Sequence, residues 1–135
     1  MVKKKPSKIK TYFLPRRIPD KMIKYVEKSE KKKFKRKPTL HYAEMIGTNA
    51  THESTTSGDK VKSAKITMGL HVLSTNKKKP FTNKGKVVLL HELRENLYIQ
   101  NNPKSRSIKT AKNPYHKKAN THRTRDSSNV RKGLI

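Results

Sequence analysis

Positive charge in this sequence is concentrated at its two ends, and this distribution limits the folds that the chain can adopt. The 135 residues include 35 Lys or Arg and 9 Asp or Glu, which gives a formal net charge of +26. Residues 1–37 carry +13 and residues 104–135 carry +9, whereas residues 38–103 carry only +4. Because like charges repel each other and small cores are only marginally stable, we expect one small core with two basic extensions.

Several classes of protein are excluded by what the sequence lacks. There is no cysteine, so a disulfide framework, a thiol nucleophile and a Cys-based zinc site are excluded. No apolar run approaches the ~20 residues that a membrane helix needs, so we expect no membrane partner. Neither GxGxxG nor GxxxxGK[ST] occurs, so no nucleotide-binding loop is indicated. We therefore expect no cofactor and no small-molecule substrate.

Alternating apolar residues predict a strand over residues 64–73. Ala64, Ile66, Met68, Leu70 and Val72 alternate with polar or small residues, which is the period of a half-buried strand. Residues 39–46 are either a partner strand or a short helix, because their pattern fits both. Residues 47–59 are rich in Thr, Ser, Asn and Gly and are expected to form a loop with a turn at 57–59.

A helix is predicted over residues 86–100, where apolar residues recur at helical spacing and polar residues fall mostly on the other side. Thr82 or Asn83 can cap its start, and residues 101–103, which end in a proline, stop it. Residues 86–90 alone could instead be a buried strand. The apolar positions are Val87, Leu90, Leu93 and Leu97, and the polar ones are Glu92, Arg94, Glu95 and Asn96.

A second helix is expected from Asp20, a plausible capping residue, and it ends in the basic run 31–37. Its apolar stripe consists of Met22, Ile23 and Val26, followed by Phe34. The predicted class is α+β: a small irregular domain with a strand or hairpin, one or two helices and long basic extensions. We divide the chain into an N-terminal arm (1–37), a core (38–103) and a C-terminal extension (104–135).

No catalytic or metal-binding constellation is evident among the six histidines. His91 and Glu95 are four residues apart on a predicted helix, and we interpret them as a surface contact. His52 and Glu53 lie in the predicted loop, where a catalytic role is not expected. His116 and His122 lack a matching acidic residue, so we interpret them as solvated or phosphate-contacting. The sequence thus predicts no enzyme, no catalytic residue and no metal.

The basic segments are suited to binding a polyanion such as a nucleic acid. Lysine outnumbers arginine 27 to 8, which favours contacts to a phosphate backbone over bidentate reading of bases. Tyr12, Phe13 and Tyr115 lie within basic runs and are candidates for stacking on unpaired bases. Phe34 and Phe81 are more easily explained as hydrophobic anchors. The cations expected to contact RNA are Lys3, Lys4, Lys5, Arg16, Arg17, Lys31, Lys32, Lys33, Lys35, Arg36, Lys37, Lys77, Lys78, Lys79, Arg106, Lys117, Lys118, Arg123 and Arg125.

A small core with long, proline-punctuated basic arms resembles ribosomal proteins as a class, on the basis of residues 1–37 and 104–135. The resemblance implies a structural RNA-binding role in a ribosome of the mitochondrion or cytoplasm, with rRNA and neighbouring ribosomal proteins as partners. One alternative is a DNA-compacting or viral nucleoprotein that binds duplex without sequence preference. A second alternative is a nuclear adaptor whose helix at 86–100 binds protein.

Overall fold

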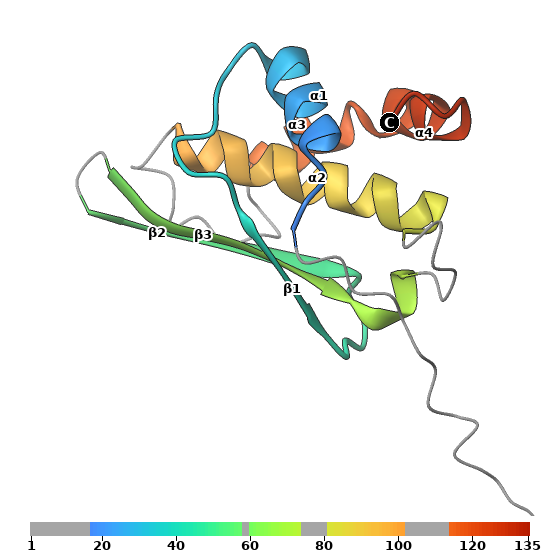
Figure 1. Cartoon of the computed structure of the whole chain (residues 1–135), viewed down its shortest axis with the longest axis horizontal. Helices are drawn as coiled ribbons and strands as arrows, with labels where there is room; N and C mark the ends of the chain where they lie inside the picture. Colours follow the sequence, from blue (N-terminus) through green and yellow to red (C-terminus); the bar gives the residue numbers. More distant parts are fainter. Residues whose placement is uncertain (1–16, 58–59, 74–80, 102–113) are drawn as a thin grey trace, which may run out of the picture.

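The computed structural model describes residues 17–57, 60–73, 81–101 and 114–135, and it confirms the α+β class (Figure 1). A three-stranded mixed sheet forms one layer, helix α2 lies over it, and the remaining helices lie over α2. The elements in chain order are α1 (Asp20–Glu30), β1 (Thr39–Ala43), β2 (Ala50–Ser57), β3 (Lys60–Gly69), a 3₁₀ turn η2 (Leu70–Val72), α2 (Asn83–Gln100), α3 (Pro114–Asn120) and α4 (Arg123–Arg131).

Strand β3 is the centre of the sheet, between β1 and β2. Its predicted alternation is confirmed, because Ala64, Ile66 and Met68 are buried against the helical layer. The strand ends at Gly69, so the prediction that it continues to residue 73 is wrong. Glycine offers no side chain to pack on a neighbouring strand, and the chain then turns through η2.

The other two strands differ from the hairpin that the sequence suggested. Residues 39–43 are a strand, as one of the two interpretations proposed, but β1 pairs with β3 in parallel. The predicted loop 47–59 contains β2, which pairs with β3 antiparallel, so that prediction is wrong. Its many Thr residues are β-branched and suit a pleated surface with one face in solvent. The register Ser57↔Lys60 places the chain reversal at the predicted turn, whose residues 58 and 59 lie outside the described ones.

Helix α2 confirms the predicted helix and excludes the strand alternative for residues 86–90. Thr82 caps it, because its Oγ1 accepts a hydrogen bond from the Gly85 N–H at 2.9 Å. The polar residues opposite the apolar stripe do not face solvent. Glu92, Arg94, Glu95 and Asn96 are all buried. The reason is that α2 lies between the sheet on one side and α1, α3 and α4 on the other (Figure 1).

Both flanks contribute to the hydrophobic core, which is therefore wider than the expected range 38–103. Ile18 and Val26 pack into it from the N-terminal side, and Val130 and Ile135 do so from the C-terminal side. The described part of the C-terminal extension also forms two helices that the sequence did not predict. Helix α1 begins where expected, but Asp20 is its first residue and makes no side-chain cap.

Arg94 joins the helices across this core. Its side chain is completely buried, and its Nε and Nη2 donate to the two carboxylate oxygens of Asp126 on α4 at 3.1 and 2.8 Å. The same guanidinium donates to Glu30 and, at 2.9 Å, to Ser29, both on α1. A polar side of α2 can thus be buried because distant segments supply its partners.

Among the described residues, no helix is long and apolar enough to cross a membrane.

Candidate metal centre and basic surface

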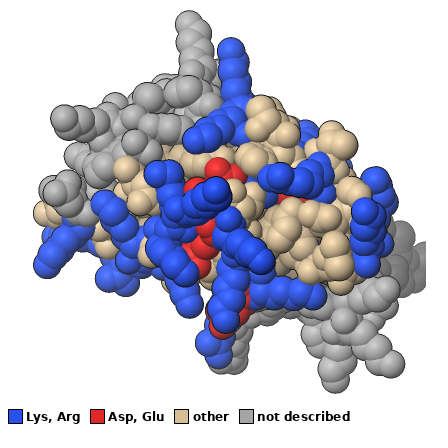
Figure 2. Space-filling model, turned by 90° about the horizontal axis from the view of Figure 1, so that it is seen from above, with Lys and Arg blue, Asp and Glu red and all other residues tan. Residues whose placement is uncertain are grey.

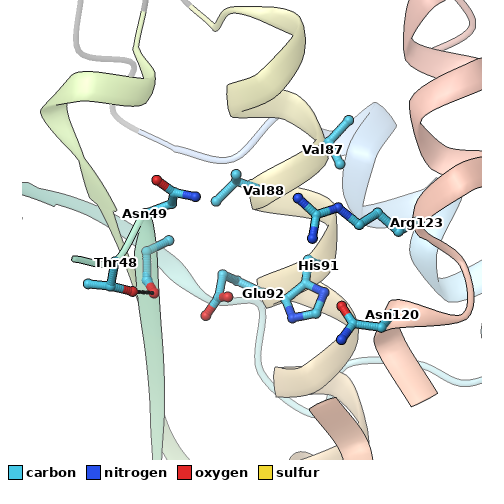
Figure 3. Close-up of a pocket in the computed structure, with 9 residues that line it drawn as sticks. Thr48, Asn49, Val87, Val88, His91, Glu92, Asn120 and Arg123 are labelled. Atoms are coloured by element: carbon cyan, nitrogen blue, oxygen red, sulfur yellow. Dashed lines mark hydrogen bonds between the residues drawn. The ribbon is translucent and has the colours of Figure 1, made fainter. Parts of the chain in front are cut away.

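A pocket of about 200 Å³ opens between the start of β2, one face of α2, and the junction of α3 with α4. Figure 3 shows Thr48 and Asn49 on one wall, Asn120 and Arg123 on the opposite wall, and His91 and Glu92 between them. Val87, Val88 and Ala50 complete the lining. The pocket is thus a mainly polar hollow with a small apolar part formed by Ala50, Val87 and Val88.

Helix α2 brings three metal-ligating side chains together beside this pocket. His91, Glu92 and Glu95 each offer a ligand atom, and these atoms lie within 4.8 Å of one another. His91 and Glu95 are one helical turn apart, so both side chains lie on the same face, with 2.5 Å between Nε2 and Oε2. The His91 side chain is 17% exposed and that of Glu95 only 4%. The prediction of a surface contact between them is therefore wrong.

The Glu92 carboxylate is largely buried beside the pocket. The residue is 9% exposed. Burial, together with the neighbouring charge of Glu95, raises the pKa of Glu92 to about 8. A carboxyl group with a strongly shifted pKa beside a pocket is typical of functional sites.

His52 approaches the cluster from β2. Its Nε2 lies 3.5 Å from Glu95 Oε1, and its side chain is only 7% exposed. The sequence had placed His52 in a loop, which is wrong, because residue 52 lies within β2 and faces α2. A second imidazole in contact with a ligating carboxylate can either orient that carboxylate or complete the ligand set.

The spacing of these residues in the sequence is itself a signal for a metal site, which the interpretation as a surface contact did not use. Two zinc-binding histidines of many hydrolases stand four residues apart on a helix, with a glutamate directly after the first. His91-Glu92-Leu93-Arg94-Glu95 has this spacing, with a carboxylate at the second ligand position. Glutamate is also a common zinc ligand, so the substitution keeps the chemistry of the site. Among the described residues, this is the one cluster with metal-binding geometry.

The predicted RNA-binding cations are only partly described. Those that the structure places are all exposed at the surface: Arg17, Lys31, Lys32, Lys33, Lys35, Arg36, Lys37, Lys117, Lys118, Arg123 and Arg125. Lys3, Lys4, Lys5, Arg16, Lys77, Lys78, Lys79 and Arg106 lie outside the described residues, as do Tyr12 and Phe13. Tyr115 and His116 belong to α3, but their side chains also lie outside the described part.

Some of these cations have internal partners. Arg36 donates through Nε to the Val61 carbonyl at 3.1 Å, and the Lys118 ammonium lies 4.7 Å from the centre of the Tyr98 ring. Arg123 lines the pocket instead of standing apart from the core (Figure 3). Phe34 and Phe81 are buried in the core, which agrees with the interpretation of both as anchors.

His122 differs from its expected role as a solvated or phosphate-contacting residue. Its Nε2 lies 3.1 Å from Glu30 Oε2, in the same network as Arg94. Burial and the charge of Arg94 lower the pKa of His122, and the opposing effect of Glu30 is smaller. The imidazole therefore belongs to the contact between α1 and α4.

Comparisons with protein families, with curated proteins and with solved structures found no match for this chain.

Proposed function

We propose that the chain is a metal-dependent hydrolase that cleaves an amide bond at the pocket beside α2. The observation that carries this proposal is the convergence of His91, Glu92 and Glu95 on one buried helical face that borders a pocket. The geometry supports two metal ligands, His91 and Glu95, and a third residue, Glu92, that acts on water.

Zinc fits the donor set best. One imidazole nitrogen and one carboxylate oxygen, held on a helix, are ligands that Zn²⁺ binds at about 2.0–2.2 Å. Two such ligands lie roughly 3.3 Å apart around a tetrahedral ion. The His91 and Glu95 atoms are 2.5 Å apart, so a small side-chain rotation would admit the ion between them. Bound zinc would act as a Lewis acid on a substrate carbonyl and would make a bound water more acidic.

We assign Glu92 as the general base. Its side chain lies beside the proposed ligands and faces the pocket (Figure 3). A dication held by His91 and Glu95 would favour the ionised form of Glu92 over the protonated form that burial favours, and the ionised carboxylate can accept a proton from water. The oxygen of that water attacks the carbonyl carbon of the amide. The proton held by Glu92 then passes to the departing nitrogen as the C–N bond breaks, which leaves a carboxylic acid and an amine. Arg123 and Asn120, on the opposite wall, can donate hydrogen bonds to the substrate carbonyl oxygen.

Strand β2 favours an extended peptide as the substrate. Ala50 at the start of β2 lines the pocket, and β2 is an edge strand of the described sheet. The unpaired side of an edge strand offers alternating backbone donors and acceptors to an added strand. A peptide bound along this edge would carry its backbone toward the pocket.

Zinc binding to the full chain is the first test. Titration calorimetry is expected to give one Zn²⁺ per chain, and His91→Ala or Glu95→Gln should weaken zinc binding at least about 100-fold. Glu92→Gln should keep zinc, since Glu92 is not proposed as a ligand. His41→Ala and Glu53→Gln are matched controls, because both residues are exposed on the outer face of the sheet. Equal zinc binding by all variants would contradict the site.

A variant at a further histidine tests how the ligand set is completed. His52 touches Glu95 from β2. We expect His52→Ala to weaken zinc binding about as much as His91→Ala does. Unchanged zinc binding by His52→Ala would show that His52 is not a ligand.

Hydrolysis is the second test. The zinc-loaded chain, incubated with a library of quenched fluorescent peptides, should cleave a subset of them, and a chelator should stop the cleavage. Glu92→Gln should retain zinc yet lose at least about 100-fold in rate, since general-base catalysis contributes 10²–10⁴-fold. Zinc binding without any peptide cleavage would contradict the catalytic proposal and assign the ion a structural role.

The ribosomal role implied by the basic arms stays a prediction, as do the alternatives of a DNA-compacting nucleoprotein and a nuclear adaptor. Eight of the nineteen cations on which these ideas depend lie outside the described residues. The metal centre is a local proposal about α2 and is compatible with a chain that also binds a polyanion.

A further inference from the structure

The end of helix α1 carries a dense group of exposed cations. Lysines at positions 24, 28, 31, 32 and 33 surround a shallow groove, with Glu27 as the one acidic residue in its lining. They lie on the outer side of α1, because Met22, Ile23 and Val26 on its other side are buried in the core. Together with Arg125 of α4, we call Lys24, Lys28, Lys31, Lys32 and Lys33 the α1 cation surface.

Hydrogen bonds hold the parts of this surface together. Arg125 Nη2 donates to Ser29 Oγ on α1 at 3.1 Å, so the start of α4 lies against the end of α1. Asn101 Nδ2, at the end of α2, donates to the Lys33 carbonyl at 3.3 Å. Three segments that are distant in the sequence are therefore fixed side by side. The cations form a prearranged group, which reduces the entropy lost when a ligand binds.

The acidic residues of this region are turned inward. Glu27 has a side chain only 10% exposed and accepts a hydrogen bond from the Phe34 N–H at 2.9 Å. Glu30 is 7% exposed and pairs with the buried Arg94, and Asp126 is 3% exposed. The charges of Glu30 and Asp126 are thus directed to internal partners, whereas Glu27 also lies 4.0 Å from the Lys33 ammonium. Figure 2 shows this face from above: Lys and Arg side chains cover much of it and surround a smaller acidic strip.

We infer that the α1 cation surface binds the phosphate backbone of RNA, independently of the proposed metal centre. Five of its six cations are lysines, which suit phosphates in many geometries and do not read bases bidentately. Helix α1 packs on α2, and its side with Met22, Ile23 and Val26 is buried, so only its outer side is open to a ligand. The cations belong to α1, to the loop that follows it and to α4, so they are irregularly spaced. This spacing suits the irregular phosphate positions of a folded RNA.

The test compares two triple variants of the full chain that remove the same charge. The first variant combines Lys28→Gln, Lys31→Gln and Lys32→Gln. The matched control combines Lys60→Gln, Lys62→Gln and Lys84→Gln, three exposed lysines outside the α1 cation surface. Binding to a fluorescent RNA hairpin is measured by anisotropy over a range of salt. The first variant should lose at least about tenfold in affinity, and its slope of log affinity against log salt should fall by about 2–3. The control should lose less than about twofold.

Two results would overturn the inference. Equal losses in both triple variants would mean that binding follows net charge and not this surface. Tighter binding to a DNA duplex of the same length than to the hairpin, with the same dependence on Lys28, Lys31 and Lys32, would assign the surface to DNA. Circular dichroism of both variants establishes that each is folded before affinities are compared.

Discussion

At the scale of single residues, one buried cation explains how a strongly basic chain keeps a compact core. Arg94 is fully buried and meets two carboxylates, Glu30 and Asp126, as well as the Ser29 hydroxyl. Its guanidinium also lies 5.7 Å from the centre of the Tyr25 ring. A buried charge is tolerated only when its hydrogen bonds are made, and here three segments of the chain make them.

Replacing Arg94 by Met should destabilise the protein severely. The variant keeps an unbranched side chain of comparable length but leaves Glu30 and Asp126 buried without their cation. Removing one partner of a buried ion pair costs about 3–5 kcal/mol, and urea denaturation followed by circular dichroism measures this loss. Arg131→Met, at an exposed position on α4, is the control and should change stability by less than about 0.5 kcal/mol. A loss below about 1 kcal/mol for Arg94→Met would show that the pairs do not hold the helices together.

At the scale of elements, the start of α2 is fixed against η2 by a close backbone approach. Thr82 Oγ1 donates to the Val72 carbonyl at 2.9 Å while it also caps α2. Gly85 lies directly above the same carbonyl: a Cβ at this position would be 2.4 Å from Val72 O. Glycine is required here for space, since backbone cannot move aside as a flexible side chain can.

Gly85→Ala should therefore destabilise the protein, although the same change inside an unobstructed helix stabilises by about 0.5–1 kcal/mol. We expect a loss of about 1–3 kcal/mol from the clash, measured as a lower midpoint of thermal unfolding. Lys84→Ala is the control, because this neighbouring residue is exposed and alanine favours helix. A higher midpoint for Gly85→Ala would show that η2 can move away from α2 at little cost.

The spacing of apolar residues predicted the helix and the strand that have one apolar face. It did not predict the strand whose inner face makes polar contacts with a distant segment of the chain. Strand β3 and helix α2 were found because Ile66 and Leu93 belong to regular apolar patterns. Strand β2 was missed because its buried positions include His52 and Ser54, which contact Asn96 of α2 and carry no apolar signal.

The buried cluster of His91, Glu92 and Glu95 was not predicted, for a related reason. The spacing of His91, Glu92 and Glu95 is visible in the sequence, but a pattern of this kind is also that of an exposed helical ion pair. These groups are buried because β2 lies on one side of them, where His52 touches Glu95, and the junction of α3 with α4 lies on the other side. The position of α4 depends in turn on the contact between Arg94 and Asp126. Neither contact is encoded in the local pattern of α2.

At the scale of the whole molecule, the surface is more basic than the composition implies. Among the described acidic residues, Glu30, Glu92, Glu95 and Asp126 have little exposed side chain and are used inside the fold. The described lysines, by contrast, are mostly exposed. The formal charge of +26 thus underestimates the positive charge that the outer surface presents. Such a surface repels itself and lowers the stability of the compact state.

This imbalance predicts that salt stabilises the protein. Raising sodium chloride from about 0.01 M to about 0.15 M shortens the screening length from roughly 30 Å to 8 Å, which weakens repulsion between exposed cations. The buried pairs of Arg94 are screened much less, so their contribution should remain. We expect the midpoint of thermal unfolding to rise over this range. The rise should be smaller in the variant that combines Lys60→Gln, Lys62→Gln and Lys84→Gln, because it has less repulsion to screen. A midpoint that falls with salt would mean that attractive ion pairs at the surface outweigh the repulsion.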